Sequence, residues 1–194
     1  MNHKNSLIAA AGALMVLMAQ GAQAQAATYA IDPSHTYATF EITHFGTSTN
    51  RGRFDKKEGT VEFDRAGKTG KVELTLDPAS VSTGVAPLDT HLKSKDFFNV
   101  AENGTVKFVG DKLNFDGDKV TSVSGTLTML GKTVPVTLNA TNFNCYQNPL
   151  IKREVCGGDF ETTITRSKWG MNYGLDYGIP DNVRLLIQVE AAKQ

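Results

Sequence analysis

An alternation of apolar and mostly polar residues constrains the fold of this chain more than any other feature. It runs through residues 36–44, 72–77, 134–140 and 183–191. In the first run the residues on the more apolar face are Ala38, Phe40, Ile42 and His44. Because side chains alternate across a strand, each run predicts a strand with one apolar face and one wettable face. Such strands are typical of antiparallel sheets.

Turn-forming sequences separate these runs. They are Asp64-Arg65-Ala66-Gly67, Asp116-Gly117-Asp118, Leu130-Gly131-Lys132 and Cys156-Gly157-Gly158. Asp and Gly favour tight turns, because Gly adopts a positive φ at little cost and Asp binds nearby backbone amides. The short spacing predicts sequential strands joined by hairpins, a meander of about eight to ten strands. We expect one domain over residues 27–194.

The stretch after Thr83 departs from the strand pattern. Its residues at helical spacing are Leu88, His91, Leu92 and Lys95. Pro87 suits a first helical turn, and Asp89 places negative charge near the positive end of a helix. We therefore predict a short α-helix packed against one end or side of the sheet. Phe97 and Phe98, which follow it, are expected to return to the apolar interior or to line its rim.

A sheet of about eight such strands can close into a barrel or stack as a sandwich. Closure removes exposed edges, and a barrel of this size has room for one ligand if its inward side chains are small. The apolar faces carry many Val, Ala, Thr and Leu residues, with larger Phe residues among them. This mixture favours an all-β, antiparallel barrel of about eight strands with one short α-helix over a sandwich.

The N-terminus has the features of a secretory signal peptide. Lys4 precedes an apolar run over residues 7–19, and Ala-x-Ala patterns permit cleavage after Ala24 or Ala26. The run is shorter than the ~20 residues that a membrane helix needs, which disfavours an uncleaved anchor. We predict a signal peptide over residues 1–26, export to a bacterial periplasm and no membrane span in the remaining chain.

Cys145 and Cys156 are the two cysteines of the chain. In an oxidising compartment an even count predicts a disulfide, here across a strand-to-strand connection that contains Asn148-Pro149. It would close a loop of about a dozen residues and contribute ~3 kcal/mol. A metal pair or a reactive thiol is the alternative, although no His or second Cys pair lies nearby in the sequence.

Charge and motifs argue against several classes of function. The chain has 20 basic and 20 acidic residues, without the clustered Lys and Arg that nucleic-acid binding requires. We find no Gly-x-Ser-x-Gly elbow, phosphate-binding glycine loop, dinucleotide fingerprint or zinc-protease helix. No pair of His residues lies with a carboxylate at metal-binding spacing on one element. We expect neither an enzyme nor a metal site, and no cofactor.

Several separated motifs, in order and at matching spacing, resemble the YceI-like family over residues 29–191. They are Ile31-Asp32-Pro33-Ser34-His35, Phe40-Glu41-Ile42-Thr43-His44-Phe45-Gly46, Asp89-Thr90-His91-Leu92, Gly131-Lys132-Thr133-Val134-Pro135 and Arg166-Ser167-Lys168-Trp169-Gly170-Met171. The resemblance implies a secreted, lipocalin-like barrel whose apolar interior holds a polyisoprenoid or similar amphiphile. Family analogy also makes a homodimer one expected assembly.

Two departures from the family pattern bear on the ligand. The family commonly has a basic residue just before the helix Asp, and this chain has Leu88 there. If a cation at that place helps to hold a pyrophosphate, this protein is expected to prefer an uncharged or weakly polar head group. The segment between Cys145 and Cys156 is not a general family feature, and we expect its loop to reshape the entrance.

The candidate ligand-binding residues form two sets. Candidates for the head group or the mouth are His35, His44, Arg53, Asp89 and His91. Candidates for the apolar tunnel are Phe40, Ile42, Leu92, Phe97, Phe98, Trp169 and Met171. For several of them a purely structural role is the alternative: a hydrogen-bonded core residue for His44 and His91, a helix cap for Asp89 and plain packing for Trp169.

Two functional hypotheses follow. The first is a periplasmic carrier that holds a polyisoprenoid-like lipid as a hydrophobic small-molecule ligand. The second is a secreted β-sandwich that acts as an interaction module, with a filled core, an exposed apolar patch and no lipid. A hollow interior distinguishes the first from the second.

Overall fold

Eleven strand segments and one α-helix form the part of the chain that the computed structural model describes, residues 26–194. The strands are β1 (Ala27–Ile31), β2 (Tyr37–His44), β3 (Ser48–Phe54), β4 (Lys57–Asp64), β5 (Thr69–Leu76), β6 (Val81–Ser82), β7 (Val106–Asp116), β8 (Lys119–Met129), β9 (Lys132–Gln147), β10 (Glu154–Thr165) and β11 (Asn182–Lys193). The helices are α1 (Ala86–Lys93) and the 3-10 helices η1 (Pro78–Ser80), η2 (Arg166–Trp169) and η3 (Leu175–Tyr177). Apart from Ala26, the predicted signal peptide lies outside the described residues.

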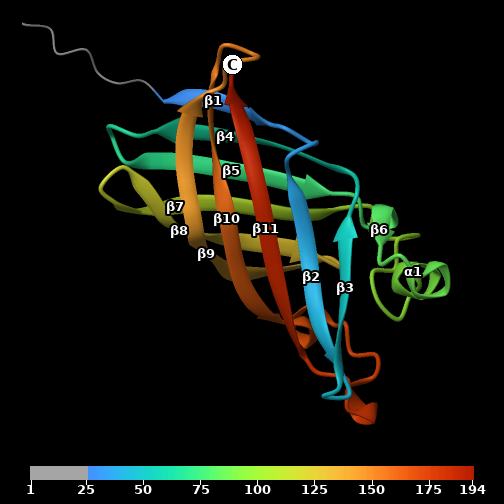
Figure 1. Ribbon diagram of the computed structural model, residues 1–194. Helices are drawn as coiled ribbons and strands as arrows, with labels where there is room; N and C mark the ends of the chain where they lie inside the picture. The colour runs from blue at the N-terminus through green and yellow to red at the C-terminus, as the bar shows by residue number, and fades with distance from the viewer. Residues whose placement is uncertain (1–25) are drawn as a thin grey trace, which may run out of the picture.

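All strands belong to one antiparallel sheet that closes on itself (Figure 1). β1 and β2 both pair with β11, so together they form one interrupted strand. β4 pairs with β1, and β3 pairs with β2, so β3 and β4 form a second interrupted strand. β5 and β6 form a third interrupted strand, because they pair with β4 and β3. The ring therefore has eight strands in meander order. This confirms the predicted barrel and excludes the sandwich.

The interruption between β1 and β2 is anchored to β11 at Glu190. The backbone amide of Asp32 donates to the Glu190 carbonyl at 2.8 Å. Thr36, which is fully buried, directs its hydroxyl to the same carbonyl at 3.3 Å. The buried hydroxyl is thereby satisfied, and the chain re-enters the sheet three residues out of the register of β1.

The inward faces of the strands are those that the alternation predicts. The β11 residues that line the interior are Val183, Leu185, Ile187, Val189 and Ala191. Ala38, Phe40 and Ile42 do the same on β2. His44, assigned to that face by parity, is instead exposed, because β2 ends there and turns into the β3 hairpin.

The predicted turns at residues 64–67, 116–118 and 130–132 lie at hairpin connections, but the turn predicted at Cys156-Gly157-Gly158 is wrong. Gly157 and Gly158 lie inside β10, between β9 and β11. A Cβ on Gly157 would lie 2.1 Å from the Val189 carbonyl oxygen, and one on Gly158 would lie 2.1 Å from that of Asn142. These glycines allow close approach of neighbouring strands, which is another common reason for Gly in a sheet.

The predicted disulfide is confirmed. Cys145 on β9 and Cys156 on β10 are register partners with Cα atoms 4.1 Å apart. The bond closes the base of the β9–β10 hairpin, whose loop contains Asn148 and Pro149 as expected.

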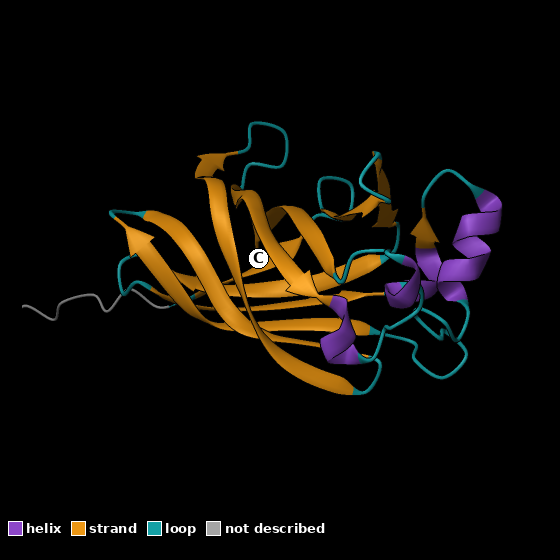
Figure 2. Ribbon diagram, turned by 90° about the horizontal axis from the view of Figure 1, so that it is seen from below, coloured by secondary structure: helices purple, strands orange, loops and turns teal. Residues whose placement is uncertain are grey.

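Helix α1 confirms the helix predicted after Thr83. It lies on the opposite side of the barrel from the β4–β5 and β7–β8 turns (Figure 1). β6 does not pair with β7, and the chain between them includes α1. Figure 2 shows this helix at one end of the barrel. Within residues 26–194, every helix is too short or too polar to cross a bilayer.

Candidate functional site

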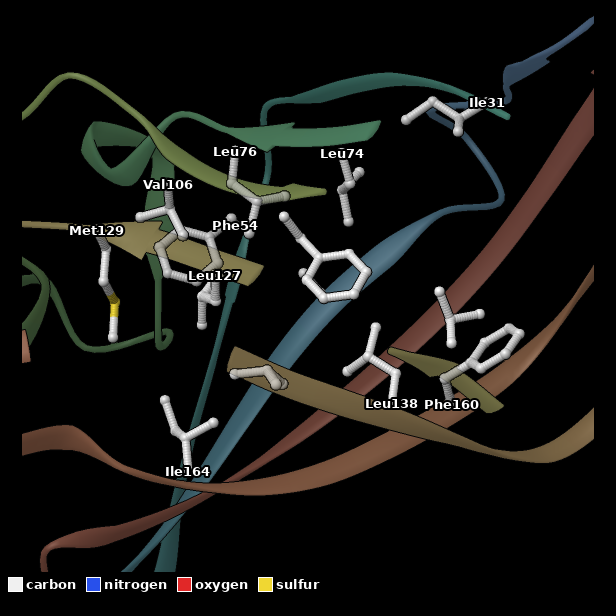
Figure 3. Close-up of a cluster of buried hydrophobic side chains, with 14 of the residues drawn as sticks. Ile31, Phe54, Leu74, Leu76, Val106, Leu127, Met129, Leu138, Phe160 and Ile164 are labelled. Carbon is white, nitrogen blue, oxygen red and sulfur yellow. The ribbon is translucent and has the colours of Figure 1, made fainter. Parts of the chain in front are cut away.

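The barrel interior contains two adjoining cavities with almost wholly apolar walls. Cavity 1, on the α1 side, has a volume of about 140 Å³, and cavity 2 has a volume of about 80 Å³. Four residues line both and form the wall that they share: Leu74, Phe108, Leu138 and Ile187. Figure 3 shows side chains from opposite walls directed into this interior, with Leu74, Leu76 and Val106 facing Leu138 and Ile164. The centre of the barrel is therefore hollow and lined by apolar side chains.

Six of the seven predicted tunnel residues line cavity 1. They are Phe40, Ile42, Leu92, Phe97, Phe98 and Met171. α1 supplies Leu92, and the turn after it brings Phe97 and Phe98 over the gap between β6 and β7. Phe98 packs edge-on against Phe54 of β3, with ring centroids 5.4 Å apart. The segment from Leu92 to Phe98 thus closes one side of the cavity with its own apolar side chains.

Trp169, the seventh predicted tunnel residue, lines neither cavity. It is the last residue of η2, and its side chain is 2% exposed and packs in the core. The indole Nε1–H donates to the Leu127 carbonyl at 3.1 Å, which satisfies the one polar atom of the ring. The structure gives Trp169 a packing role at the end of β10.

His91 lies at the rim of cavity 1. Its Nε2 lies 3.1 Å from a carboxylate oxygen of Asp96, and its ring meets those of Phe97 and Tyr173 edge-on at 5.0 and 4.8 Å. Phe97 lines the cavity, whereas Tyr173 belongs to the segment after η2. His91 therefore joins two segments that are distant in the sequence, and it is half-exposed, so it is not a core residue.

The Asp89 side chain binds the segment that precedes α1. Its Oδ1 accepts hydrogen bonds from the backbone amide of Thr83, at 2.7 Å, and from the Thr83 hydroxyl, at 2.6 Å. It does not cap the start of α1, because the N-cap residue is Val85 and no side chain makes a cap hydrogen bond there. The carboxylate holds the helix against the loop that precedes it.

The other predicted head-group residues do not gather at this rim. His35 is exposed and pairs with Asp32 at 2.7 Å, and hydrogen bonds from Ser34 and His35 lower the pKa of Asp32 to about 2. His44 packs edge-on against Phe45, with ring centroids 4.7 Å apart. The Arg53 side chain pairs with Asp55 at 2.8 Å and lies over the ring of Tyr37. Of the five predicted head-group residues, His91 is the one whose ring packs against an aromatic residue that lines cavity 1.

Arg166 is the residue of this site that the sequence analysis did not single out. It is 2% exposed and borders cavity 1. Its guanidinium donates from Nε to the Pro180 carbonyl at 2.9 Å, from Nη1 to that of Met171 at 2.8 Å and from Nη2 to that of Ile179 at 3.4 Å. Burial lowers the pKa of Arg166, although the nearby Asp181 opposes this shift. Arg166 thereby holds the segment from Met171 to Pro180 against the cavity.

A polar pocket of about 400 Å³ adjoins the far end of cavity 2. Tyr29 and Phe63 line both, with their rings edge-on and their centroids 6.2 Å apart. The Tyr29 hydroxyl and an Arg65 guanidinium nitrogen each donate to Glu154 at 2.7 Å. Among residues 26–194, no group of three His, Cys, Asp or Glu side chains is arranged to hold a metal ion.

Known proteins are similar to this chain in sequence and in fold. The sequence model of the YceI-like domain matches residues 29–191. A UPF0312 protein of Ectopseudomonas mendocina is 34% identical over 181 residues, which cover 90% of this chain and 92% of that protein.

Two solved structures resemble the barrel. The YCEI protein of Campylobacter jejuni is 26% identical, with a TM-score of 0.67 over 79% of this chain and 90% of that one. A polyisoprenoid binding domain from Saccharophagus degradans has a TM-score of 0.62 at 15% identity, over 86% of this chain and 98% of that one. The match over nearly the whole barrel and the identity to the Ectopseudomonas protein show that the chain belongs to the YceI-like family.

Proposed function

We propose that this protein binds a polyisoprenoid or similar long-chain amphiphile in cavities 1 and 2 and carries it through the periplasm. The observation that carries the proposal is the pair of adjoining apolar cavities with a shared wall. An apolar cavity of about 150 Å³ stays dry and accepts small apolar molecules, so cavity 1 has room for a section of a hydrocarbon chain. No cofactor is needed for this role.

The energetics suit a flexible hydrocarbon chain. Each methylene that leaves water contributes about 0.8 kcal/mol, so a chain threaded through both cavities gains affinity without directional contacts. The solved structure from Saccharophagus degradans is named as a polyisoprenoid binding domain, which supports the same class of ligand for this barrel. Because the walls offer few polar groups, we expect chain length to matter more than chain identity.

The head group is expected near a polar group at one end of the tunnel. His91 and Asp96 stand at the rim of cavity 1, and Arg65 and Glu154 stand beyond cavity 2. Leu88 leaves α1 without a cation just before Asp89. We therefore favour an uncharged or weakly polar head over a pyrophosphate.

Two features of different kinds support a periplasmic location. The N-terminal segment has the pattern of a signal peptide, and the Cys145–Cys156 disulfide suits an oxidising compartment. Fractionation of producing cells would test this location directly, with the processed chain expected in the periplasmic fraction.

Native mass spectrometry of the purified protein, followed by organic extraction, tests the binding. We expect a bound lipid that added prenyl lipids displace. Ile187→Trp should fill the space where the two cavities meet and lower the fraction of protein with bound lipid by about tenfold or more. Leu186→Trp, on the outward face of the same strand, is the matched control and should leave it unchanged. A ligand-free mass under gentle conditions, without uptake of added prenyl lipids, would overturn the proposal.

A further inference from the structure

The hairpin loop between β9 and β10 exposes two adjacent large apolar side chains. Leu150 is 88% exposed and Ile151 is 50% exposed, and Tyr146 at the base of the loop is 41% exposed. In Figure 1 this loop projects beyond the barrel beside the C-terminus. A single exposed apolar residue is ordinary on a protein surface, whereas adjacent exposed apolar residues are typical of a binding surface.

The loop is held rigidly in this conformation. The Asn148 side chain accepts hydrogen bonds from the backbone amides of Leu150, at 2.9 Å, and Ile151, at 3.3 Å. The Asn148 backbone accepts from the Lys152 amide at 3.0 Å and donates to the Arg153 carbonyl at 2.9 Å. The Cys145–Cys156 disulfide closes the base. Because the loop satisfies its own backbone and is stapled, its apolar tip is displayed by a preorganised structure.

Two exposed cations follow the apolar pair directly. Lys152 and Arg153 are both exposed, and among residues 26–194 no carboxylate lies within 4.0 Å of either charged group. The adjacent Glu154 is already paired with Arg65. The exposed apolar residues at the other end differ: Phe45 stands next to His44 and Gly46, and Tyr177 next to Asp176 and Gly178. Among the large exposed apolar residues of the described chain, Leu150 and Ile151 are the ones followed directly by two cations without an ion pair.

We propose that the β9–β10 hairpin docks the protein onto the surface of an anionic phospholipid bilayer. Leu150 and Ile151 would enter the head-group region, while Lys152 and Arg153 would face lipid phosphates. Short apolar segments flanked by basic residues bind membranes through this combination of burial and charge. The hairpin also stands over cavity 2, since Cys156 lines that cavity. Docking would therefore bring one end of the tunnel to the lipid surface.

Vesicle flotation with protein produced from the full chain tests this docking. The probes are vesicles of phosphatidylglycerol and phosphatidylethanolamine in equal amounts, and vesicles of phosphatidylcholine alone. We expect binding to the anionic vesicles at low salt and its loss as salt rises, because salt screens exposed charges. The paired changes Leu150→Ser with Ile151→Ser, and Lys152→Gln with Arg153→Gln, should each weaken binding by about tenfold or more.

The matched control changes exposed apolar residues at the other end, Phe45→Ser with Tyr177→Ser, and should leave vesicle binding unchanged. Native mass spectrometry of each variant shows whether bound lipid is retained, which separates this inference from the proposed cargo. Equal binding to both kinds of vesicle, undiminished binding of the Leu150/Ile151 variant or loss in the control would each overturn it. A wild-type protein that stays off the vesicles would overturn it too, and would point to a protein partner for the loop.

Discussion

The hydroxyl of Tyr29 donates a 2.7 Å hydrogen bond to Oε1 of Glu154, and so joins β1 to the first residue of β10 across the end of the barrel. Arg65 completes the group by binding the other carboxylate oxygen at 2.7 Å. Burial, with the adjacent carboxylate, raises the pKa of Tyr29 to about 12. Because Tyr29 also lines cavity 2, this contact fixes part of the cavity wall.

Tyr29→Phe should change how stability depends on alkaline pH. A pKa above that of an unfolded tyrosine, about 10, means that the neutral hydroxyl is favoured in the fold. Its contribution is complete below about pH 10 and is lost as the pH rises towards about 12. The variant should lose about 1–2 kcal/mol at neutral pH and fall less steeply between pH 10 and 12. Urea unfolding across this range measures both, and parallel curves for the two proteins would contradict the assignment.

Trp169→Phe should lower stability without changing ligand binding. The variant loses the hydrogen bond to Leu127 and leaves a small void in the core, at a cost of about 1–3 kcal/mol. Since Trp169 lines neither cavity, the amount of bound lipid should stay constant. Phe98→Ala, which alters the wall of cavity 1, is the comparison and should change both quantities. Denaturation measures stability, and native mass spectrometry measures bound lipid. A marked loss of lipid in Trp169→Phe would contradict a purely structural role for Trp169.

Removal of the disulfide should cost about 2–3 kcal/mol, because the cross-link restricts a short loop in the unfolded chain. The variant is Cys145→Ser with Cys156→Ser, compared with the wild type by urea unfolding. Reductant should bring the wild type to the stability of the variant and leave the variant itself unchanged. A response of the variant to reductant would reveal an effect unrelated to this bond.

Arg166→Lys should free the segment that follows η2. A lysine ammonium cannot bind the Pro180, Met171 and Ile179 carbonyls together, as the planar guanidinium does. We expect a loss of about 3 kcal/mol or more, since carbonyls lose their donors in a buried place. Hydrogen exchange should accelerate in residues 171–181 and stay unchanged in the distant β7–β8 hairpin. Unaltered exchange in that segment would rule out the positioning role of Arg166.

The barrel could be predicted because its determinants are local in the sequence. The alternation of Ile187 and Val189 with the polar Gln188 and Glu190 fixes which face turns inward, and Asp116-Gly117-Asp118 marks a hairpin by its own turn chemistry. Gly157 could not be interpreted in this way, because a glycine that permits close strand approach looks like one that permits a turn. Its role depends on Val189 of β11, which is distant in the chain.

The candidate site was predictable only in its apolar part. Phe40 and Phe98 follow from strand parity and from the helix pattern, whereas polar contacts depend on which loops meet. His91 lies beside Tyr173, which is distant in the sequence, and Arg166 is buried by carbonyls of a segment with no regular pattern. A lone arginine in a polar motif resembles a surface residue, and the only available signal was its place in the Arg166–Met171 motif.

The pairing of the first strands with β11 has a consequence for how the protein is made. Every other strand pairing joins segments that are near in sequence, so a curved sheet can grow progressively from the N-terminus. The pairing of β1 and β2 with β11 alone joins the two ends of the chain. Until the 12 residues of β11 add to the sheet, its apolar inner face is exposed to water. The closed interior is consequently the last part of the molecule to form, and a chain truncated before Asn182 would have an open, curved sheet in place of a barrel.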